Sequence, residues 1–286
     1  MTPFTLPGFD LASFVKATLD EDLGVGLPGG GHDVTSESVI PEDTRFAGVM
    51  DSRDAITVAG LPIAAAFFRA LDPDIAIELL VGEGARVGPG TDLMRITGNA
   101  RAMLTAERSA LNTVQHLSGI ATLTRAYVDA MGGHATLLDT RKTIPGMRHL
   151  EKYATRIGGA QNHRMGLWDA AMIKDNHVLV ASGVAEAVRR ARNAGVEDII
   201  CEVDQLDQIE PALNAGASHL LLDNMGLVEL RAAVAMIAGR VPSEASGGVR
   251  LDTIGAIAAT GVTYVSVGRL TQSAPAADIG LDFTPL

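Results

Sequence analysis

The chain has 286 residues and a mass of 29.8 kDa, enough to bury the core of one large domain or two smaller ones. Its formal net charge of −11 and pI ≈ 5.0 argue against a protein that tracks nucleic-acid phosphates, because such proteins normally carry a broad basic face. The single cysteine, Cys201, excludes an internal disulfide and a cysteine-based metal cluster.

The beginning of the chain, Met1 to Asp22, is acidic and lacks the basic and apolar regions of a signal peptide. No segment approaches about 18 uninterrupted apolar residues, so we expect no spanning helix and a cytoplasmic protein. The first hundred residues and the helical stretch after them favour an α+β domain, with a boundary near residue 110 to 118. Its expected elements are strands at Thr44–Ser52 and Ala55–Val58, a helix at Leu61–Leu71, a turn-rich β segment at Gly82–Leu93 and a helical stretch at Ala100–Met131, broken near Ser118–Gly119.

From Ala135 onward, short apolar runs alternate with amphipathic ones. The spacing of roughly 20 to 30 residues between apolar runs is typical of right-handed βαβ units and a parallel sheet. The expected strands are Ala135–Asp139, Ala170–Lys174, Asp198–Val203, His219–Asp223, Pro242–Ser246 and Tyr264–Gly268. The expected helices are Val184–Asn193, Leu206–Ala215, Leu227–Ala238 and Leu251–Thr260, with caps at Gly195, Gly216 and Gly261.

Charged and polar residues stand where these strands end. In an α/β barrel the loops after the strands form the face that holds the active site, so this distribution predicts a site there. Six strands are evident, which indicates a barrel of fewer than eight strands or one with a strand that the pattern does not reveal. The strand ends carry Asp139–Arg141–Lys142, Lys174, Glu202, Asp223, Glu244–Ser246 and Ser266–Gly268.

A cationic segment lies within this acidic protein. Between Arg141 and Lys174 there are seven Lys or Arg residues against two acids, a balance of +5, so the rest of the chain sums to −16. Like charges that crowd together repel unless an anion lies among them. Four of these cations lie at strand ends or in loops, and we call them the cationic quartet; they are Arg141, Lys142, Arg164 and Lys174. Guanidinium and ammonium groups suit carboxylates and phosphates, so the quartet predicts a pocket for a small polyanion.

Other motifs carry less information. Gly24–Gly29 matches G-x-G-x-x-G, but no strand precedes it and no helix follows, so a loop is expected. The helical spacing of Arg148, Lys152 and Arg156 favours a solvated helix face. His116, His134, His149 and His219 favour structural roles, whereas His163 and His177 lie in polar segments; Trp168 and Phe67–Phe68 favour the core.

Two acids, Glu202 and Asp223, end otherwise apolar strands, where burial has to be offset by a partner. They could pair with the cationic quartet, or they could hold Mg²⁺ or the sugar hydroxyls of a phosphorylated substrate. The glycines Gly247, Gly248 and Gly268 allow close approach to the backbone, and late βα loops of such barrels commonly bind phosphate.

Taken together, the sequence closely resembles quinolinate phosphoribosyltransferase. The resemblance runs in order through L-T-A-E-R-S-A-L-N (104–112), H-L-S-G-I-A-T (116–122), D-T-R-K-T-I-P-G (139–146), G-G-A-Q-N-H-R-M-G-L (158–167), I-K-D-N-H (173–177), C-E-V-D (201–204), L-L-D-N (221–224), E-A-S-G-G (244–248) and V-G-R-L-T (267–271). It implies an α+β domain over residues 1–115, joined by the tail 275–286. It also implies an incomplete, seven-stranded α/β barrel over residues 116–274, and a homodimer with shared active sites.

The resemblance implies that quinolinate and phosphoribosyl pyrophosphate are converted to nicotinate mononucleotide, pyrophosphate and CO₂ with Mg²⁺, in de novo NAD biosynthesis. Residues that would bind the dicarboxylate and nearby phosphate are Arg108 (from the partner subunit), Thr140, Arg141, Lys142, His163, Arg164 and Lys174. Glu202 and Asp223 would act on the ribose and on Mg²⁺, directly or through the pyrophosphate. Together with Lys142 they form the expected catalytic set. The 5′-phosphate would contact Ser246, Gly247, Gly248, Gly268, Arg269 and Leu270.

The chemistry of the residues agrees with this resemblance. Carboxylates can stabilise the positive charge that develops on the ribose as pyrophosphate leaves. The pyridine nitrogen is already a nucleophile, so positioning matters more than a base. Lys142 is the predicted proton donor to the ring carbon. The chain departs from the family pattern G-A-L-T-H-S at Arg269 and Gln272, and its glycine-rich segment at 24–31 is longer than usual.

Three alternatives remain open from the sequence. One is the homologue linked to molybdate transport, against which the presence of Arg108 argues. A second is a Schiff-base aldolase that uses Lys142 or Lys174, since crowded cations lower a lysine pKa. The third is an anion-binding protein without turnover.

Overall fold

The computed structural model describes residues 4–286, and these fall into two compact units. The first comprises the chain up to Leu123 together with His149–Gly158 and Ala274–Leu286. The second comprises Thr124–Arg148 and Gly159–Ser273. Within residues 4–286, no helix has the combination of length and apolar character that crossing a membrane requires.

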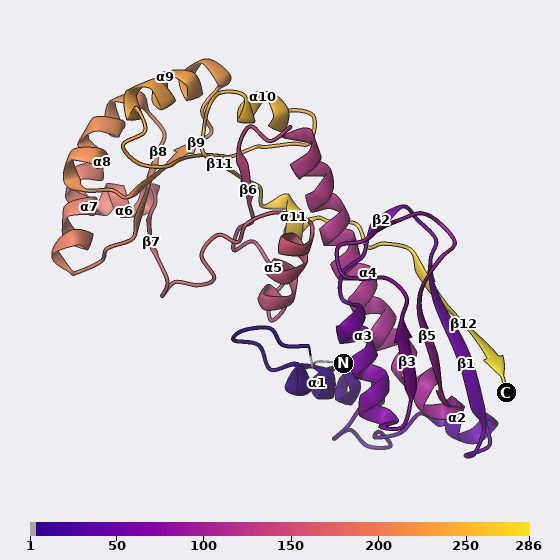
Figure 1. Ribbon diagram of the computed structural model, residues 1–286. Helices are drawn as coiled ribbons and strands as arrows, with labels where there is room; N and C mark the ends of the chain where they lie inside the picture. The colour runs from indigo at the N-terminus through magenta and orange to yellow at the C-terminus, as the bar shows by residue number, and fades with distance from the viewer. Residues whose placement is uncertain (1–3) are drawn as a thin grey trace. The chain divides into compact units, whose positions relative to one another are not determined.

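The first unit is built on a four-stranded antiparallel sheet with the order β12-β1-β5-β3 (Figure 1). Residues far apart in the chain meet here, because Ala47 pairs with both Thr284 and Thr97. The strands are β1 (Arg45–Ser52), β3 (Ala76–Leu79), β5 (Thr91–Asn99) and β12 (Ile279–Pro285), and β2 (Ile56–Thr57) pairs separately with β4 (Arg86–Val87). The helices are α1 (Leu11–Leu23), α2 (Val34–Val39), α3 (Leu61–Leu71), α4 (Ala100–Ala130, which continues into the second unit) and α5 (Arg148–Ile157).

Helix α4 runs without interruption through Ser118 and Gly119, so the predicted break there is wrong. The two small residues serve packing instead. The Ser118 hydroxyl accepts a hydrogen bond from the Ala59 amide at 3.0 Å and donates to the Ala59 carbonyl at 3.1 Å. A Cβ on Gly119 would lie 2.0 Å from the Pro275 carbonyl oxygen, so only glycine admits that close approach.

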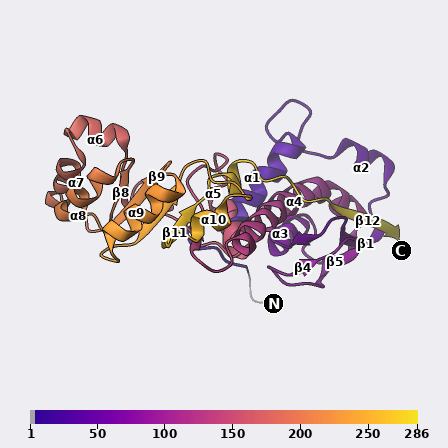
Figure 2. The same cartoon turned by 90° about the horizontal axis from the view of Figure 1, so that it is seen from above.

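The second unit contains a parallel sheet of six strands with the order β6-β11-β10-β9-β8-β7, which confirms the predicted α/β class. Helices α7 to α10 follow one side of this sheet (Figures 1 and 2). The strands are β6 (Thr136–Leu138), β7 (Ala171–Ile173), β8 (Ile199–Val203), β9 (His219–Asp223), β10 (Ser243–Ser246) and β11 (Tyr264–Ser266). The helices are α6 (Asp175–Ala181), α7 (Val184–Asn193), the 3-10 helix η1 (Leu206–Gln208), α8 (Ile209–Ala215), α9 (Leu227–Ile237), α10 (Ile254–Ala258) and α11 (Arg269–Gln272).

Local chemistry explains where several helices begin and end. Gly216 caps α8 as predicted, with φ of 99°, in the left-handed region that favours glycine. Gly195 and Gly261 are also left-handed, with φ of 83° and 94°, but they lie beyond the C-caps of α7 and α10, which are Ala194 and Ala259. The glycine-rich segment after α1 forms turns rather than a strand and helix, so it is not a dinucleotide-binding loop. Asp33 then caps α2 by accepting hydrogen bonds from the Thr35 and Ser36 amides.

Two predictions about exposure are wrong. Lys152 is 1% exposed on α5, so it does not belong to a solvated face, although Arg156 on the same helix is exposed. Trp168 is 83% exposed rather than part of the core. Its loop turns outward because the Asp169 carboxylate accepts hydrogen bonds from the amides of Met165 and Gly166 at 2.5 and 3.1 Å. Phe67 and Phe68 are fully buried, as predicted.

Candidate active site

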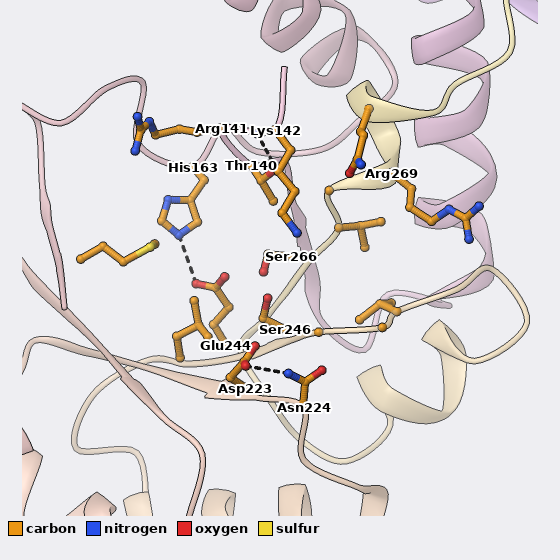
Figure 3. Close-up of a pocket in the computed structure, with 18 of the residues that line it drawn as sticks. Thr140, Arg141, Lys142, His163, Asp223, Asn224, Glu244, Ser246, Ser266 and Arg269 are labelled. Carbon is orange, nitrogen blue, oxygen red and sulfur yellow. Dashed lines mark hydrogen bonds and ion pairs between the residues drawn. The ribbon is translucent and has the colours of Figure 1, made fainter. Parts of the chain in front are cut away.

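A cavity of about 850 Å³ opens where the strands of the parallel sheet end, and all of its lining belongs to the second unit (Figure 3). The loops after β6, β9, β10 and β11 supply most of the walls. The sequence-predicted residues that line it are Thr140, Arg141, Lys142, His163, Arg164, Lys174, Asp223, Ser246, Gly247, Gly248, Gly268 and Arg269.

Three predicted site residues are not part of this lining. Arg108 lies on α4 in the first unit, where it is exposed. Leu270 is fully buried and supports α11 from within. Glu202 has a side chain that is 11% exposed, and its carboxylate forms an ion pair with the amine of the lining residue Lys174 at 2.5 Å. The sequence left open whether Glu202 pairs with the cationic quartet, and in this structure it does.

Arg141 and Arg164 form the cationic wall of the pocket. The Nε atoms of both side chains are buried, and neither has a hydrogen-bond partner among residues 4–286. Burial lowers the pKa of Arg164, and the neighbouring charge of Arg141 lowers it further, although Asp169 opposes this effect. Two adjacent guanidinium groups with buried donors left over favour an anion between them, because unpaired buried donors carry a free-energy cost.

Lys142 reaches into the middle of the same pocket, whereas the guanidinium of Arg269 points away from it (Figure 3). The Lys142 backbone is held on both sides, since its amide donates to Thr140 Oγ1 at 3.0 Å and its carbonyl accepts from Thr271 Oγ1 at 2.8 Å. A Cβ on Gly268 would lie 2.7 Å from Lys142 Cδ. Glycine at position 268 therefore leaves room for the lysine side chain.

Opposite the cations, Asp223 presents a carboxylate at the end of β9. Burial raises the pKa of Asp223, the nearby Glu202 charge raises it further, and Lys174 lowers it. Asn224 donates from Nδ2 to Asp223 Oδ2 at 2.7 Å (Figure 3), and this orients the carboxylate. Asn224 adopts a left-handed backbone with φ of 54°, and a Cβ on Gly247 would lie only 2.2 Å from its Oδ1. Gly247 is thus needed for this arrangement.

Several lining residues were not predicted as site residues. Asn224 belongs to a turn, and Arg250 and Gln272 lie beyond the strand ends, so no strand pattern pointed to them. Glu244 is fully buried within β10, and its acidic character in a short strand was the available signal. His177, which lies in a polar segment, accepts a hydrogen bond at Nδ1 from the Lys174 amide at 3.0 Å and so caps α6. Glu244, Ser266 and Val267 belong to predicted strand ends but had no assigned role, and the other unpredicted lining residues are Met172, Leu221, Asn224, Val249, Arg250 and Gln272.

Carboxylate oxygens are the donors that could hold a metal here. Residues 4–286 contain no group of three or more His, Cys, Asp or Glu side chains with metal-binding geometry. The Glu202 charge raises the pKa of Asp223, and a divalent cation would relieve that repulsion. The donor set therefore fits Mg²⁺, which usually takes one or two carboxylates and fills its remaining positions with water and substrate phosphates.

Comparison with known proteins places this geometry in a family. The family model for the C-terminal domain of quinolinate phosphoribosyl transferase matches residues 120–282, and that for its N-terminal domain matches residues 33–118. The chain belongs to the quinolinate phosphoribosyl transferase family. The pocket lies in the part matched by the C-terminal domain, and Arg108 in the part matched by the N-terminal domain.

Individual members of the quinolinate phosphoribosyl transferase family match along nearly the whole chain. Nicotinate-nucleotide pyrophosphorylase (carboxylating) of Mycobacterium leprae is 42% identical over 286 residues, covering 96% of this chain and 98% of that protein. Quinolinate phosphoribosyltransferase (decarboxylating) 1b of Nicotiana tabacum is 39% identical, covering 96% and 83%. The crystal structure of NadC from Streptococcus pyogenes superposes with a TM-score of 0.93 at 36% identity and covers 99% of both chains.

Proposed function

We propose that this protein transfers the phosphoribosyl group of phosphoribosyl pyrophosphate to quinolinate and releases CO₂, giving nicotinate mononucleotide and pyrophosphate in de novo NAD biosynthesis. The observation that carries the proposal is the pair of buried Nε atoms on Arg141 and Arg164, which have no partner among residues 4–286, in a pocket that also contains Lys142 and Asp223. A dicarboxylate would pair with these cations, and a phosphorylated sugar would occupy the side nearer Asp223. Membership of the family supports both assignments.

Positioning of two anions is the first task of the site. Quinolinate and phosphoribosyl pyrophosphate repel each other in water, and the cationic quartet offsets that repulsion. Arg141 and Arg164 can bind carboxylates through two parallel hydrogen bonds each, which fixes the orientation of the ring as well as its place. Holding the ring nitrogen against the anomeric carbon of the ribose then replaces an unfavourable encounter by a step within one complex.

Bond exchange follows from this arrangement. The ring nitrogen forms a bond to the anomeric carbon as the bond from that carbon to pyrophosphate breaks. Positive charge develops on the ribose, and the carboxylates of Asp223 and Glu202 stabilise it. The same two residues would hold Mg²⁺, which when bound supplies positive charge to the departing pyrophosphate.

Loss of CO₂ completes the reaction. The electron pair of the broken bond between the ring carbon and its 2-carboxylate stays on the ring carbon, where the positive charge of the adjacent quaternised nitrogen stabilises it, and the ring carbon then uses this pair to take up a proton. Lys142, whose amine points into the pocket, is the proposed proton donor (Figure 3). The proposed phosphate-binding segment comprises Ser246, Gly247, Gly248, Gly268 and Arg269.

A homodimer with shared sites is also proposed. Arg108 is exposed on the first unit and absent from the pocket lining of its own chain. Large apolar side chains stand exposed in the loops and helices of the second unit, which suits a covering partner. These exposed side chains are Ile144, Leu167, Trp168, Leu179, Val180, Leu227, Val228 and Leu251.

Mixing two inactive variants tests the shared site. R108A and K142A each damage one wall of a site, so subunit exchange would create heterodimers with one intact and one doubly altered site. We expect each variant alone to lose turnover and the exchanged mixture to recover about a quarter of wild-type activity. No recovery, with exchange verified by mass spectrometry of tagged subunits, would contradict the shared site.

The finer architecture and the domain boundary are proposals as well. An isolated parallel bridge between Leu138 and Gln161 extends the sheet beyond β6 by one position, which supports a seven-stranded, incomplete barrel. The division at residues 115 and 116, with the tail 275–286 joined to the first domain, stays a prediction.

The test of the activity is an assay of the purified protein with quinolinate, phosphoribosyl pyrophosphate and Mg²⁺, following CO₂ and nicotinate mononucleotide. Nicotinate in place of quinolinate is the control, because it lacks the 2-carboxylate. Product from quinolinate and none from nicotinate is expected. Binding of both substrates by calorimetry without product would indicate an anion-binding protein instead.

A further inference from the structure

A buried carboxylate lies beneath the cationic wall. Glu244 on β10 is fully buried, and its Oε2 lies 3.2 Å from His163 Nε2 (Figure 3). The same oxygen lies 3.1 Å from Nε2 of His219, which begins β9. Burial raises the pKa of Glu244, but its hydrogen-bonding contacts with His163 and His219 lower it by more, so the group is an anion at neutral pH.

The hydrogen bond at the other ring nitrogen of His163, Nδ1, shows which nitrogen carries the proton. Nδ1 lies 2.7 Å from the backbone nitrogen of Arg164. A backbone amide can only donate a hydrogen bond, so Nδ1 is the acceptor and carries no proton. The ring proton therefore resides on Nε2, from which it is donated to Glu244. His163 is accordingly a neutral ring, and the positive charge of the pocket comes from arginine and lysine.

This geometry connects the buried acid to the anion-binding wall. The backbone amide of His163 donates to Asp139 Oδ1 at 2.8 Å, which fixes the position of the His163 backbone. The ring accepts the Arg164 amide, and the Arg164 guanidinium donates from Nη1 to the Ala170 carbonyl at 2.9 Å. Arg164 is thus held at both ends, by the His163 ring at its backbone and by Ala170 at its guanidinium.

We propose that Glu244 is a positioning residue for the anion site: it selects the Nε2-protonated form of His163, whose Nδ1 then anchors Arg164 so that its guanidinium faces the pocket. This inference rests on the proposed function, since the anion concerned is quinolinate. Glu244 itself contacts no substrate in this scheme. Its effect passes through two side chains to the group that binds a carboxylate.

The variant Glu244→Gln keeps the volume of the side chain and removes its charge. Because an amide can donate as well as accept, His163 would no longer be restricted to one form. We expect the KM for quinolinate to rise about tenfold or more, while the KM for phosphoribosyl pyrophosphate stays within about twofold. An equal rise in both constants, or no rise in either, would overturn the proposal.

A matched control exists in the first unit. Glu151 is fully buried there, and its Oε1 lies 2.9 Å from His116 Nε2. Glu151→Gln makes the same chemical change to a buried acid and histidine outside the pocket. It should change thermal stability without a selective rise in the KM for quinolinate. A selective rise of the same size in this control would show that Glu244 has no special role.

Nitrogen-15 NMR of the histidine rings measures which nitrogen of His163 carries the proton, and it does not require any Glu244 variant to fold. The resonances of His163 are assigned as those that disappear in His163→Gln. In the wild-type protein, these resonances should show an unprotonated Nδ1 and a protonated Nε2. A protonated Nδ1 in the wild type would overturn the proposal. Absence of wild-type turnover would instead count against the proposed function, and the NMR reading would still decide the state of His163.

Discussion

The two units bury polar groups in contrasting ways. In the first, the carboxylate of Glu83 accepts hydrogen bonds from the Gly60 and Leu61 amides at 2.7 and 3.0 Å and from the Tyr153 hydroxyl at 2.5 Å. These bonds cap the start of α3, and the half-buried carboxylate is satisfied within the protein. In the second unit, Arg141 and Arg164 bury Nε atoms with no partner among the described residues.

The contrast separates stability from binding. A buried group whose hydrogen bonds all end within the chain stabilises the fold, because removing it leaves its partners unsatisfied. A buried donor without a partner costs free energy in the free protein, and a ligand that supplies the missing acceptor recovers that cost on binding. Substitution of the satisfied group in the first unit should therefore lower stability, whereas substitution of the arginines in the second unit should lower activity.

The largest effect is expected at Arg141 and Arg164, whose buried Nε atoms have no hydrogen-bond partner among residues 4–286. R164A should lower kcat/KM for quinolinate by about 10²–10³-fold, because it removes a charged donor from a partly buried site. The thermal midpoint should hardly fall, since Arg164 burial and its neighbour Arg141 make the charge unfavourable in the free protein. Steady-state kinetics and calorimetric scanning check both parts, and wild-type activity would remove Arg164 from the site.

A second prediction concerns the room left for Lys142. G268A would place a methyl group 2.7 Å from Lys142 Cδ and so force the lysine to shift. Because misplacement of a catalytic group is costly, turnover should fall about tenfold, and K142A should lose more. Gly268 has an ordinary φ of −71°, so backbone strain does not confuse the result. Equal turnover in G268A and wild type would mean that the lysine position is not critical.

The contrasting substitution is E83A in the first unit. It leaves two amides and one hydroxyl without their acceptor, and stability should fall by about 1–3 kcal/mol or more. The KM for quinolinate should stay at the wild-type value when measured well below the unfolding midpoint. Denaturant titration and kinetics on the same preparation make the comparison. A raised KM without lost stability would reverse the assigned roles of the two regions.

A smaller effect, opposite in sign, is expected at Asp223. Its folded pKa is raised, first by burial and then by Glu202, so the folded state binds the proton more tightly than the unfolded state. Stability from this group is therefore greatest at low pH and falls as pH rises above the ordinary value of 3.8. D223N should thus be somewhat more stable than wild type at pH 7, and the gain should vanish in acid. The variant should nevertheless be inactive, and a stability loss at pH 7 would contradict the argument.

Much of the second unit could be predicted because the same pattern of an apolar strand followed by polar residues repeats along the chain. Each apolar strand is followed by charged or small residues, and parallel strands bring those ends to one edge of the sheet. This is why the residue pattern alone indicates the cationic quartet and Asp223 as parts of one pocket. The cytoplasmic location and the roles of the individual site residues stay predictions.

The errors have physical causes. The exposure of Trp168 depends on two hydrogen bonds to Asp169, and the continuity of α4 depends on contacts of Ser118 and Gly119 with distant segments. The position of Glu244 at a strand end is evident from the sequence, but its role is not, because that role depends on histidines that are distant in sequence. Such long-range partners leave no local pattern in the chain.

The pairing of β1 with β12 has a consequence for biosynthesis. Strand β12 follows the whole second unit in the chain, yet it covers the edge of β1 in the first unit. During translation, therefore, β1 keeps an uncovered edge until the second unit has been made. Uncovered strand edges can pair with other chains. The nascent protein thus passes through an interval of aggregation risk whose length is set by the time that the ribosome takes to synthesise the second unit.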